Sequence, residues 1–600
     1  MATAPEYAAP AETPFTAGPD RRTGARSYAV PFIVAVTGHR DLVADEIPVI
    51  RSRVRDCLFS LRYEYPSRIV VVMSSLADGA DRLVAEEALK LGMPLSVVLP
   101  MPRALYEQDF MAESRREFAA FCDAASEIFE LPLLPGSSPR SIVEPGPSRT
   151  RQYAQLGVFL SAHCHVLLAL WDGKASDLLG GTAATIQFHH HDVMAGHTPR
   201  VTSSKLNLTE DESDLVYHIV CSRDRPDGEP APGLKPFDTA WFTTDEENPR
   251  TDKISARHRK VFEYTNEFSR EAQNHAAAID KERYSLLSAE QVATLPAGLW
   301  DINQAFCAAD WLAIHYQKKV VKTLQGGHVA AFLTAVGYLT YTDLLSTPVM
   351  IGGIISLMLF AVVNNALAVR GSWQRKYLDY RTLAEGLRVQ FYWAAAGVTS
   401  GSVSKYAHDN FLQMQDTELG WIRNVMRVAG MECDVAPNLE PQGVQFAVQE
   451  WIGDDKSGQL GYYRRKSAQR IVEHDSTMRV GRLGIWTTII ALTTLLFVGS
   501  ALSDQVRTPV VYLMGIVMLM VGVRQSYAKT TAEAELIKQY EFMCRIFRNA
   551  RKRVDDADND ADRRRILKVL GDSALEEHAQ WILIHRERSI DEKEGIKLGG

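Results

Sequence analysis

The sequence predicts an α/β N-terminal domain with a Rossmann-like parallel sheet, followed by an α-helical transmembrane region of four helices arranged as two hairpins. Two patterns predict this architecture. Before residue 300, short apolar, β-branched runs alternate with amphipathic helical segments, as in βαβ units. After it, four long apolar runs stand in two close pairs. Each run approaches or reaches the roughly 20 residues that cross a bilayer as a helix.

Five apolar runs give the expected strands of the sheet. They are residues 32–36, 68–73, 95–99, 165–170 and 215–220. Helices are expected at residues 47–63, 81–91 and 183–188. Strands that alternate with helices in this way favour a parallel sheet.

The expected membrane spans are residues 329–345 with 348–369, and residues 483–502 with 509–523. Too few residues separate the members of each pair to form a domain, so the mass of the protein should lie on one side of the membrane. The alternative is that these runs are helices of a buried core. The shortness of 509–523 and the charge of Asp343 favour that alternative, whereas the basic residues beside all four runs oppose it.

Charge gives the expected orientation. Basic residues flank the outer ends of both pairs: Lys318, Lys319, Lys322, Arg370, Arg375, Lys376, Arg479, Arg482, Arg524 and Lys529. The two tips carry Asp343, Asp504 and only Arg507. By the positive-inside rule, both termini and the soluble domains are cytoplasmic, and the chain is a multi-pass protein of the inner (plasma) membrane.

Composition narrows the choice of partners. The net charge of −7 over 600 residues gives no support for a nucleic-acid partner. Seven dispersed cysteines without a CxxC pair indicate free thiols in a reducing compartment. The first 28 residues lack the apolar core of a secretory signal, and their composition is typical of a disordered tail.

Small, polar and glycine residues gather where the expected strands end. In α/β sheets, ligands bind beyond the carboxyl ends of the strands, where glycines allow a close approach and helix N-termini favour an anion. The expected ligand-binding residues are Thr37, Gly38, His39, Arg40, Ser74, Ser75, Asp78, Gly79, Asp81, Trp171, Asp172, Gly173, Gly180, Gly181 and Thr182. Any one such glycine is more often a simple turn, and His39 fits either a ligand contact or a turn.

The histidines do not predict a metal site. His163 and His165 would share one face of a strand, and His189, His190, His191 and His197 follow later. No second Cys or His pair stands at the spacing that a four-ligand zinc site needs.

Polar and small residues within the expected spans point to helix packing or to a pore. Asn364 and Asn365 are costly in lipid and should face protein or water. Glycines such as Gly352, Gly353 and Gly515 permit close helix contacts. Four helices cannot easily enclose a wide aqueous path, so a pore would need a homo-oligomer. Similar helical stretches before each hairpin (309–319 and 459–466) and after it (380–388 and 531–537) suggest a tandem duplication.

The N-terminal motifs resemble the SLOG superfamily. They are Val36-Thr37-Gly38-His39-Arg40-Asp41, then Ser74-Ser75-Leu76-Ala77-Asp78-Gly79-Ala80-Asp81, Leu99-Pro100-Met101 with Tyr106 and Asp109-Phe110, Leu170-Trp171-Asp172-Gly173 and Gly180-Gly181-Thr182, within residues 31–220. This Rossmann-like superfamily includes the LOG phosphoribohydrolases, DNA-processing proteins and the nucleotide-sensing domains of melastatin-type TRP channels. The resemblance implies a nucleotide-derived small molecule as ligand and no certain cofactor.

One departure bears on catalysis. Hydrolytic LOG members carry a PGGxGTxxE motif whose Glu is catalytic, whereas the related stretch here, Gly180 to Gln187, has no acid in that place. Glu86 and Glu87 fit a solvated helix face better than a catalytic role. The resemblance therefore favours binding over turnover.

The second half resembles the SLATT family of two-helix membrane modules. The residues that carry the resemblance are Trp451-Ile452, Tyr462-Tyr463 and the stretch 575–586. It implies a membrane pore that responds to a signal in bacterial defence. The expected division is a tail at 1–28, a SLOG-like domain at 29–290, and SLATT-like modules at 291–430 and 431–600.

Three functions fit the sequence. In the leading one, the SLOG-like domain senses a nucleotide-derived ligand and gates or assembles a pore in the lipid bilayer. In the second, the chain is a membrane-tethered nucleotide or N-glycosidic-bond hydrolase. In the third, it is a non-catalytic membrane scaffold. Whether the polar segment 222–250 forms a lid is left open by the sequence.

Overall fold

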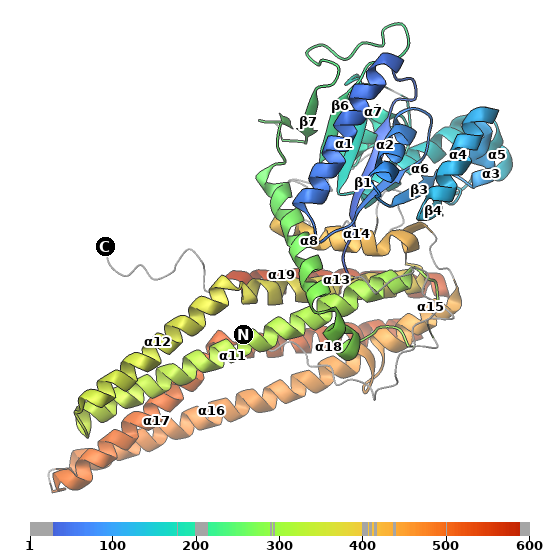
Figure 1. The fold of residues 1–600 in the computed structure, drawn as a ribbon. Helices are drawn as coiled ribbons and strands as arrows, with labels where there is room; N and C mark the ends of the chain where they lie inside the picture. The colour runs from blue at the N-terminus through green and yellow to red at the C-terminus, as the bar shows by residue number, and fades with distance from the viewer. Residues whose placement is uncertain are drawn as a thin grey trace. The chain divides into compact units, whose positions relative to one another are not determined.

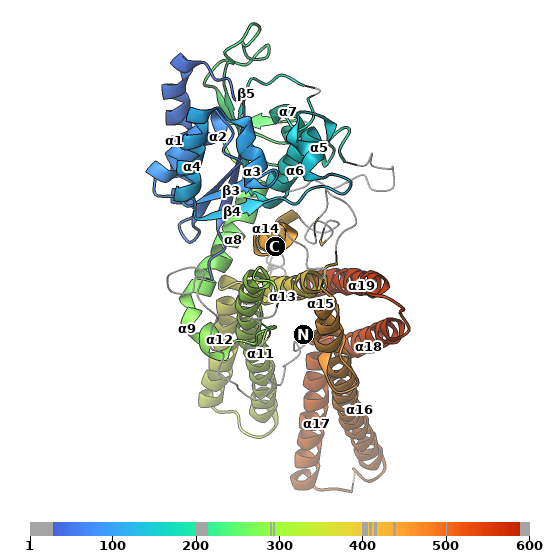
Figure 2. The same cartoon turned by 90° about the vertical axis from the view of Figure 1, so that its right-hand side faces the viewer.

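The computed structural model describes residues 28–176, 178–198, 214–245, 247–288, 291, 295–398, 406, 411–412, 417–435, 440–499 and 501–587. The chain divides into two compact units (Figures 1 and 2). The sheet unit contains Phe15–Ala309 and Leu383–Gly443, and the helical unit contains Asp310–Thr382 and Val444–Gly600. Residues 1–27 of the expected tail, and Asn410 in the central segment, lie outside the described residues.

The sheet unit is built on eight strands in the order β4-β3-β2-β1-β5-β6-β7-β8. The strands are β1 (Phe32–Gly38), β2 (Val70–Ser74), β3 (Leu95–Leu99), β4 (Glu127–Glu130), β5 (Val166–Trp171), β6 (Val216–Val220), β7 (Thr239–Phe242) and β8 (Arg250–Thr251). The first six pair in parallel, and β7 and β8 add an antiparallel edge. The predicted Rossmann-like sheet and its five strands are thus confirmed, and β4, β7 and β8 are additional.

Helices cover both faces of the sheet, which explains why its central strands are apolar throughout. The helices and short helical turns of this unit are η1 (Ala44–Glu46), α1 (Ile47–Glu64), α2 (Ala80–Lys90), α3 (Arg103–Tyr106), η2 (Glu107–Asp109), α4 (Ala112–Ala124), α5 (Pro139–Val143), α6 (Pro147–His163), α7 (Thr182–His191), α8 (Ala256–Asn274), α9 (Ala276–Glu282), η5 (Thr417–Leu419), α14 (Gly420–Val435) and α15 (Pro441–Phe446), whose last residues enter the other unit. On one face, Ile33, Ala35 and Leu167 share a core with Phe159 of α6 and Met431 of α14.

The helical unit contains two long hairpins and the helices that follow them. Its elements are α11 (Leu299–Asp343) and α13 (Trp373–Ala396), which both extend into the sheet unit, with α12 (Pro348–Arg370), the π-helical turn η6 (Ala447–Ile452), α16 (Gly458–Val498), α17 (Asp504–Thr530), α18 (Glu533–Asp555) and α19 (Asp560–Glu587). Three of them, α12, α16 and α17, are long and apolar enough to cross a membrane. The fourth expected span, at the end of α11, is diluted by glycine, threonine and tyrosine residues, and it stays a prediction.

Gly38 sets the distance between β1 and α2. A Cβ added there would overlap the Ala80 side chain and lie 2.9 Å from the Leu170 carbonyl oxygen.

We expect Gly38→Ala to force α2 away from the sheet and to lower the free energy of unfolding by about 2 kcal/mol, as overpacking does. The unfolding midpoint of the full-length protein in detergent measures this. Gly146→Ala is the matched control, because Gly146 has an extended backbone and nothing within 4 Å of its Cβ position. Equal midpoints for the two variants would contradict this packing role.

Candidate functional site

The candidate ligand crevice lies where the strand order reverses. β1 pairs with β2 on one side and with β5 on the other, and such a switch point is where α/β sheets bind ligands. The loops meet closely there: the His39 amide donates to the Leu170 carbonyl (3.1 Å), and the Ala80 amide donates to the His39 carbonyl (3.0 Å). The sequence-predicted residues of β1, β2 and β5 are therefore brought together, whereas Gly38 serves helix packing.

His39 fastens the ends of β1 and β5 to each other. Its Nε2 accepts a hydrogen bond from the Asp172 amide at 3.1 Å and lies 3.2 Å from Asp172 Oδ1. Burial lowers the pKa of His39, so the ring is neutral and Nε2 can accept. This geometry supports the turn role for His39. Asp172 is 1% exposed, and its Oδ2 has no hydrogen-bond partner among the described residues.

The loop after β2 holds a strained turn. Leu76 is fully buried with φ = 57°, a left-handed backbone that costs a branched residue about 1–2 kcal/mol. Its amide donates to Ser74 Oγ (3.1 Å), and its carbonyl accepts from Arg82 Nε (3.0 Å). Gly79 (φ = 81°) lies so close to the Arg40 backbone that any Cβ at this position would overlap the Arg40 carbonyl. Here the glycine is required by the close approach of two loops.

Asp81 is a buried carboxyl at the start of α2. Ser75 Oγ donates to its Oδ2 at 2.5 Å. Burial raises the pKa of Asp81 to about 6, although Ser75 and the charge of Arg40 act against the rise. Tyr106 of α3 is fully buried beside this group, and burial raises the pKa of its hydroxyl. Tyr106 belongs to the motifs that resemble the SLOG superfamily, but it was not among the residues predicted to bind the ligand.

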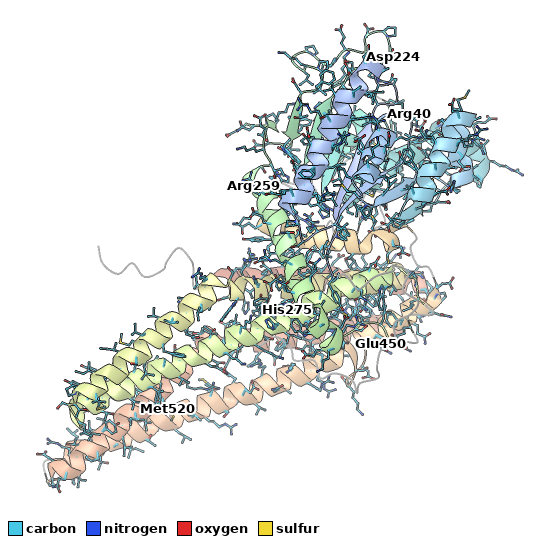
Figure 3. The ribbon with its side chains drawn as sticks, in the orientation of Figure 1. Arg40, Asp224, Arg259, His275, Glu450 and Met520 are labelled. Carbon is cyan, nitrogen blue, oxygen red and sulfur yellow. The ribbon has the colours of Figure 1, made fainter. Side chains whose placement is uncertain are left out.

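Asp78 and Arg40 have different surroundings although both were predicted to bind the ligand. Asp78 accepts from Ser114 Oγ (2.6 Å) and pairs with Arg82 (2.8 Å), so it ties α2 to α4. Arg40 is exposed, and no hydrogen bond or ion pair of its side chain occurs within the described part of the chain. Figure 3 shows Arg40 and Asp224 at the same end of the sheet domain. Arg40 is thus a cation available to an anionic ligand.

The Gly180–Thr182 segment begins α7. Gly180 has φ = 77°, and its Cβ position lies 2.8 Å from the Ala154 amide of α6. Gly181 is the N-cap residue and supplies no side-chain cap, so the first amides of α7 lack a side-chain acceptor from that position. Helix amides in this state favour an anion.

Of the remaining predicted residues, Thr37 is buried at the end of β1, Trp171 Nε1 donates to the Lys174 carbonyl (3.1 Å), and Gly173 (φ = 80°) packs on Leu234.

The segment after β6 borders the crevice. Arg223 donates to both carboxylate oxygens of Asp41 (2.9 and 3.0 Å), the Asp224 amide donates to the Asp41 carbonyl (2.8 Å), and the Ala231 amide donates to the Asp172 carbonyl (2.7 Å). The segment then forms β7 and β8. The region 222–250, left open by the sequence, is therefore bonded to the loops of β1 and β5 and to the sheet edge.

Two expectations about charged and histidine side chains were wrong. Glu87 does not lie on a solvated face: it is fully buried and pairs with Arg51 (2.9 Å) and Arg55 (2.8 Å) of α1. Burial alone would raise the pKa of Glu87, but these bonds lower it. His163 ends α6 and His165 precedes β5, so they do not share a strand face. No group of three or more His, Cys, Asp or Glu suited to a metal occurs among the described residues.

In the helical unit, α12 packs on α11, α11 on α17, and α17 on α16. Asn364 of α12 donates to the Thr323 carbonyl of α11 (2.8 Å), and Thr340 of α11 bonds Tyr512 of α17 (2.7 Å). A Cβ at Gly484 of α16 would lie 2.5 Å from Val521 of α17. Asn364 therefore faces protein, as predicted, whereas Asn365 is exposed.

Both hairpins end in the same backbone break. Ser372 (φ = 48°) separates α12 from α13, and Ala532 (φ = 50°) separates α17 from α18. Eight residues after each break stands a tyrosine: Tyr380 lies 5.9 Å from Tyr316, and Tyr540 lies 6.1 Å from Tyr463. These matches support the tandem duplication. They also align Tyr380 with Tyr540, whereas the sequence comparison set 380–388 beside 531–537.

Comparison with protein-family models, curated proteins and solved structures finds no match to this chain.

Asp81 gives a pH test of the crevice. Its folded pKa of about 6 exceeds the pKa of 3.8 that a solvent-exposed aspartate has, so between these values the folded state holds a proton that the unfolded state has released. The stabilisation is full below pH 3.8 and is lost as pH rises through 6. Asp81→Asn removes this titration. We expect the unfolding temperature of the native protein, relative to that of Asp81→Asn, to fall between pH 4 and pH 7. A constant difference would contradict the raised pKa.

Proposed function

We propose that this chain is a membrane effector in which a SLOG-like cytosolic domain senses a nucleotide-derived ligand and gates or assembles a pore formed by SLATT-like hairpins. The observations that carry the proposal are the exposed Arg40 beside the switch point of the sheet, which has no ion pair within the described part of the chain, and the N-terminus of α7, which has no side-chain cap from Gly181. The same chain carries three helices able to cross a membrane. An anionic ligand of the crevice and a bilayer are the partners that these features fit.

Contacts of α11 support a fourth span. Its Thr340 bonds Tyr512 and its Leu339 lies 3.2 Å from the Cβ position of Gly515, both on α17, while its other side meets α12. A helix with neighbours on two sides exposes less surface to lipid, so it tolerates the hydroxyl and glycine residues that lower its hydropathy. We propose that residues 329–345 cross the membrane with the other three.

A second candidate is the tethered hydrolase. The observation that favours it is Asp81, since a carboxyl with a pKa of about 6 beside Ser75 and Tyr106 suits acid–base chemistry near neutrality. Turnover of the retained ligand by the native protein, lost in Asp81→Asn, would favour this candidate.

Topology is tested with single cysteines and a membrane-impermeant maleimide. We expect labelling from the periplasmic side at Ser346→Cys and Ser503→Cys, which lie in the exposed hairpin tips. The native cysteines are free but mostly buried, and the unsubstituted protein is the control. Asn410→Cys should label only after lysis. Labelling of Asn410→Cys in intact cells would reject the two-hairpin arrangement.

The crevice and the membrane are tested together with Gly181→Asp. The backbone of Gly181 is extended (φ = −84°, ψ = 173°), and Asp is a favourable N-cap, so α7 should remain folded while a carboxylate occupies the anion position. Gly181→Asn is the matched neutral control. Mass spectrometry of small molecules retained by the purified full-length protein should find a nucleotide-derived compound with Gly181→Asn, and at least tenfold less with Gly181→Asp.

That compound should then cause dye leakage from proteoliposomes with the native protein and not with Gly181→Asp. Asn364→Leu should reduce leakage by loosening α12 from α11, and Asn365→Leu tests pore lining separately. A saturating compound that causes no leakage with correctly oriented native protein would reject the effector in favour of the hydrolase or the scaffold.

A further inference from the structure

The four hairpin helices stand in a row. Figures 1 and 2 both show them side by side in the order α12, α11, α17, α16. The contacts agree: α12 meets α11 at Ile354 and Gly337, α11 meets α17 at Leu339 and Gly515, and α17 meets α16 at Val517 and Gly484. A row has two edges, so the outer sides of α12 and α16 need a partner or lipid.

The duplication relates these edges to the contact already made inside the chain. In that contact, the first helix of module one (α11) packs on the second helix of module two (α17). The corresponding unused pair is the first helix of module two (α16) and the second helix of module one (α12). A contact of this pair between two copies would continue the row with the same kind of junction.

The positions on α12 agree with this correspondence. The α17 residues in the contact with α11 are Tyr512, Gly515 and Tyr527, which stand 20, 17 and 5 residues before Ala532. Counting the same distances back from Ser372 gives Gly352, Ile355 and Leu367. All three are exposed: Ile355 by 51% and Leu367 by 55%, with nothing within 4 Å of the Gly352 Cβ position.

The facing side of α16 is equally open. Its Gly484 and Thr488 are turned to α17 or buried, whereas Leu483, Trp486 and Ile490 are exposed by 66%, 62% and 62%. These three residues recur at helical spacing and form one apolar strip.

The contacts between neighbouring helices also set the depth of each residue along them. Three pairs of residues in contact lie at equal depth: Ile354 with Gly337, Leu339 with Gly515, and Val517 with Gly484. From Gly337 to Leu339 the chain moves two residues toward the hairpin tip, and from Gly515 to Val517 it moves two residues back. Ile354 and Gly484 therefore lie at the same depth. Two copies inserted in the same bilayer place equivalent residues at the same depth, so residues that are level within one chain are also level between copies. Ile355 of one copy would then lie opposite Leu483 of the next, and the gap at Gly352 and Gly353 would lie opposite Trp486. Close packing of a large side chain against glycines is how membrane helices gain contact.

We propose that the outer side of α12 around Gly352 and Ile355 docks on the strip of α16 (Leu483, Trp486 and Ile490) of a second copy. The interface is heterologous, so repetition closes a ring or extends an open array. It rests on the proposed membrane insertion and supplies the surface by which the proposed homo-oligomer forms. The seven native cysteines all lie outside α12, α16 and α17 and outside the expected span of α11, which leaves these helices free for engineered ones.

Oxidative cross-linking in native membranes, without added ligand, tests the proposal. Ile355→Cys and Leu483→Cys are made as two single variants with different tags and as one double variant. Because the interface is heterologous, each single variant alone should give only the background of the unsubstituted protein. The two co-expressed should give a mixed dimer and no larger product, and the double variant should give a ladder. Leu367→Cys with Leu483→Cys is the matched control, since these positions differ by about 18 Å in depth.

Each other outcome overturns the proposal in a distinct way. Self-dimers of Ile355→Cys would show a symmetric α12 contact. Equal cross-linking of the depth-shifted control would show random collision. Absence of every cross-link would leave lipid on both edges, and leakage by such protein would then reject this interface while retaining the proposed function. Gly352→Leu, at a position where an added Cβ meets nothing within 4 Å, should lower the ladder at least fivefold without lowering the unfolding temperature of the protein.

Discussion

A left-handed residue at the end of each long hairpin is the constraint on which the arrangement of the helical unit depends. Ser372 and Ala532 both carry a side chain, so each break costs about 1 kcal/mol relative to glycine. The backbone bonds around them are the same: the residue before each break bonds the carbonyl four back, and the break residue bonds the carbonyl three back. This turn redirects the chain from α12 into α13 and from α17 into α18. It places Tyr380 against Tyr316 and Tyr540 against Tyr463.

The helices that enter the hairpins have no such break. α16 runs unbroken for 41 residues, or about 60 Å, which is twice the hydrocarbon thickness of a bilayer. In each hairpin, therefore, the entering helix is long and unbroken and the returning helix ends at the break. Trp451 and Tyr463, two of the residues that suggested a membrane module from sequence, both contact Phe547, so that one aromatic cluster joins η6, α16 and α18.

Much of the fold followed from the sequence because the central strands are continuous apolar runs that end in glycine or polar turns. β4 was missed because it is a four-residue strand, Glu127 to Glu130, at the edge of the sheet, where half-buried and exposed residues alternate. β7 and β8 were missed because a polar loop separates them from β6. At the site, the positions of His39, Asp81 and Arg40 followed from strand ends. The role of each residue could not be predicted, because it depends on residues far apart in the chain. His39 bonds to Asp172, Asp81 is buried beside Ser75, and Arg40 is exposed. Glu87 shows the same limit: its partners Arg51 and Arg55 come from another helix.

The row of helices bears on how a small ligand could control a membrane. A ligand shifts a conformational equilibrium only by its difference in affinity between the two states, commonly 1–3 kcal/mol per site. One such site changes a population by roughly 5- to 150-fold, which is less than the factor of about 10,000 needed to convert a closed state fully into an open one. Several copies joined through like junctions add their contributions in a concerted transition. If the proposed α12–α16 junction and the proposed ligand site both hold, a duplicated module meets this requirement, because each ligand-bound copy would act on its own two hairpins and on those of its neighbours.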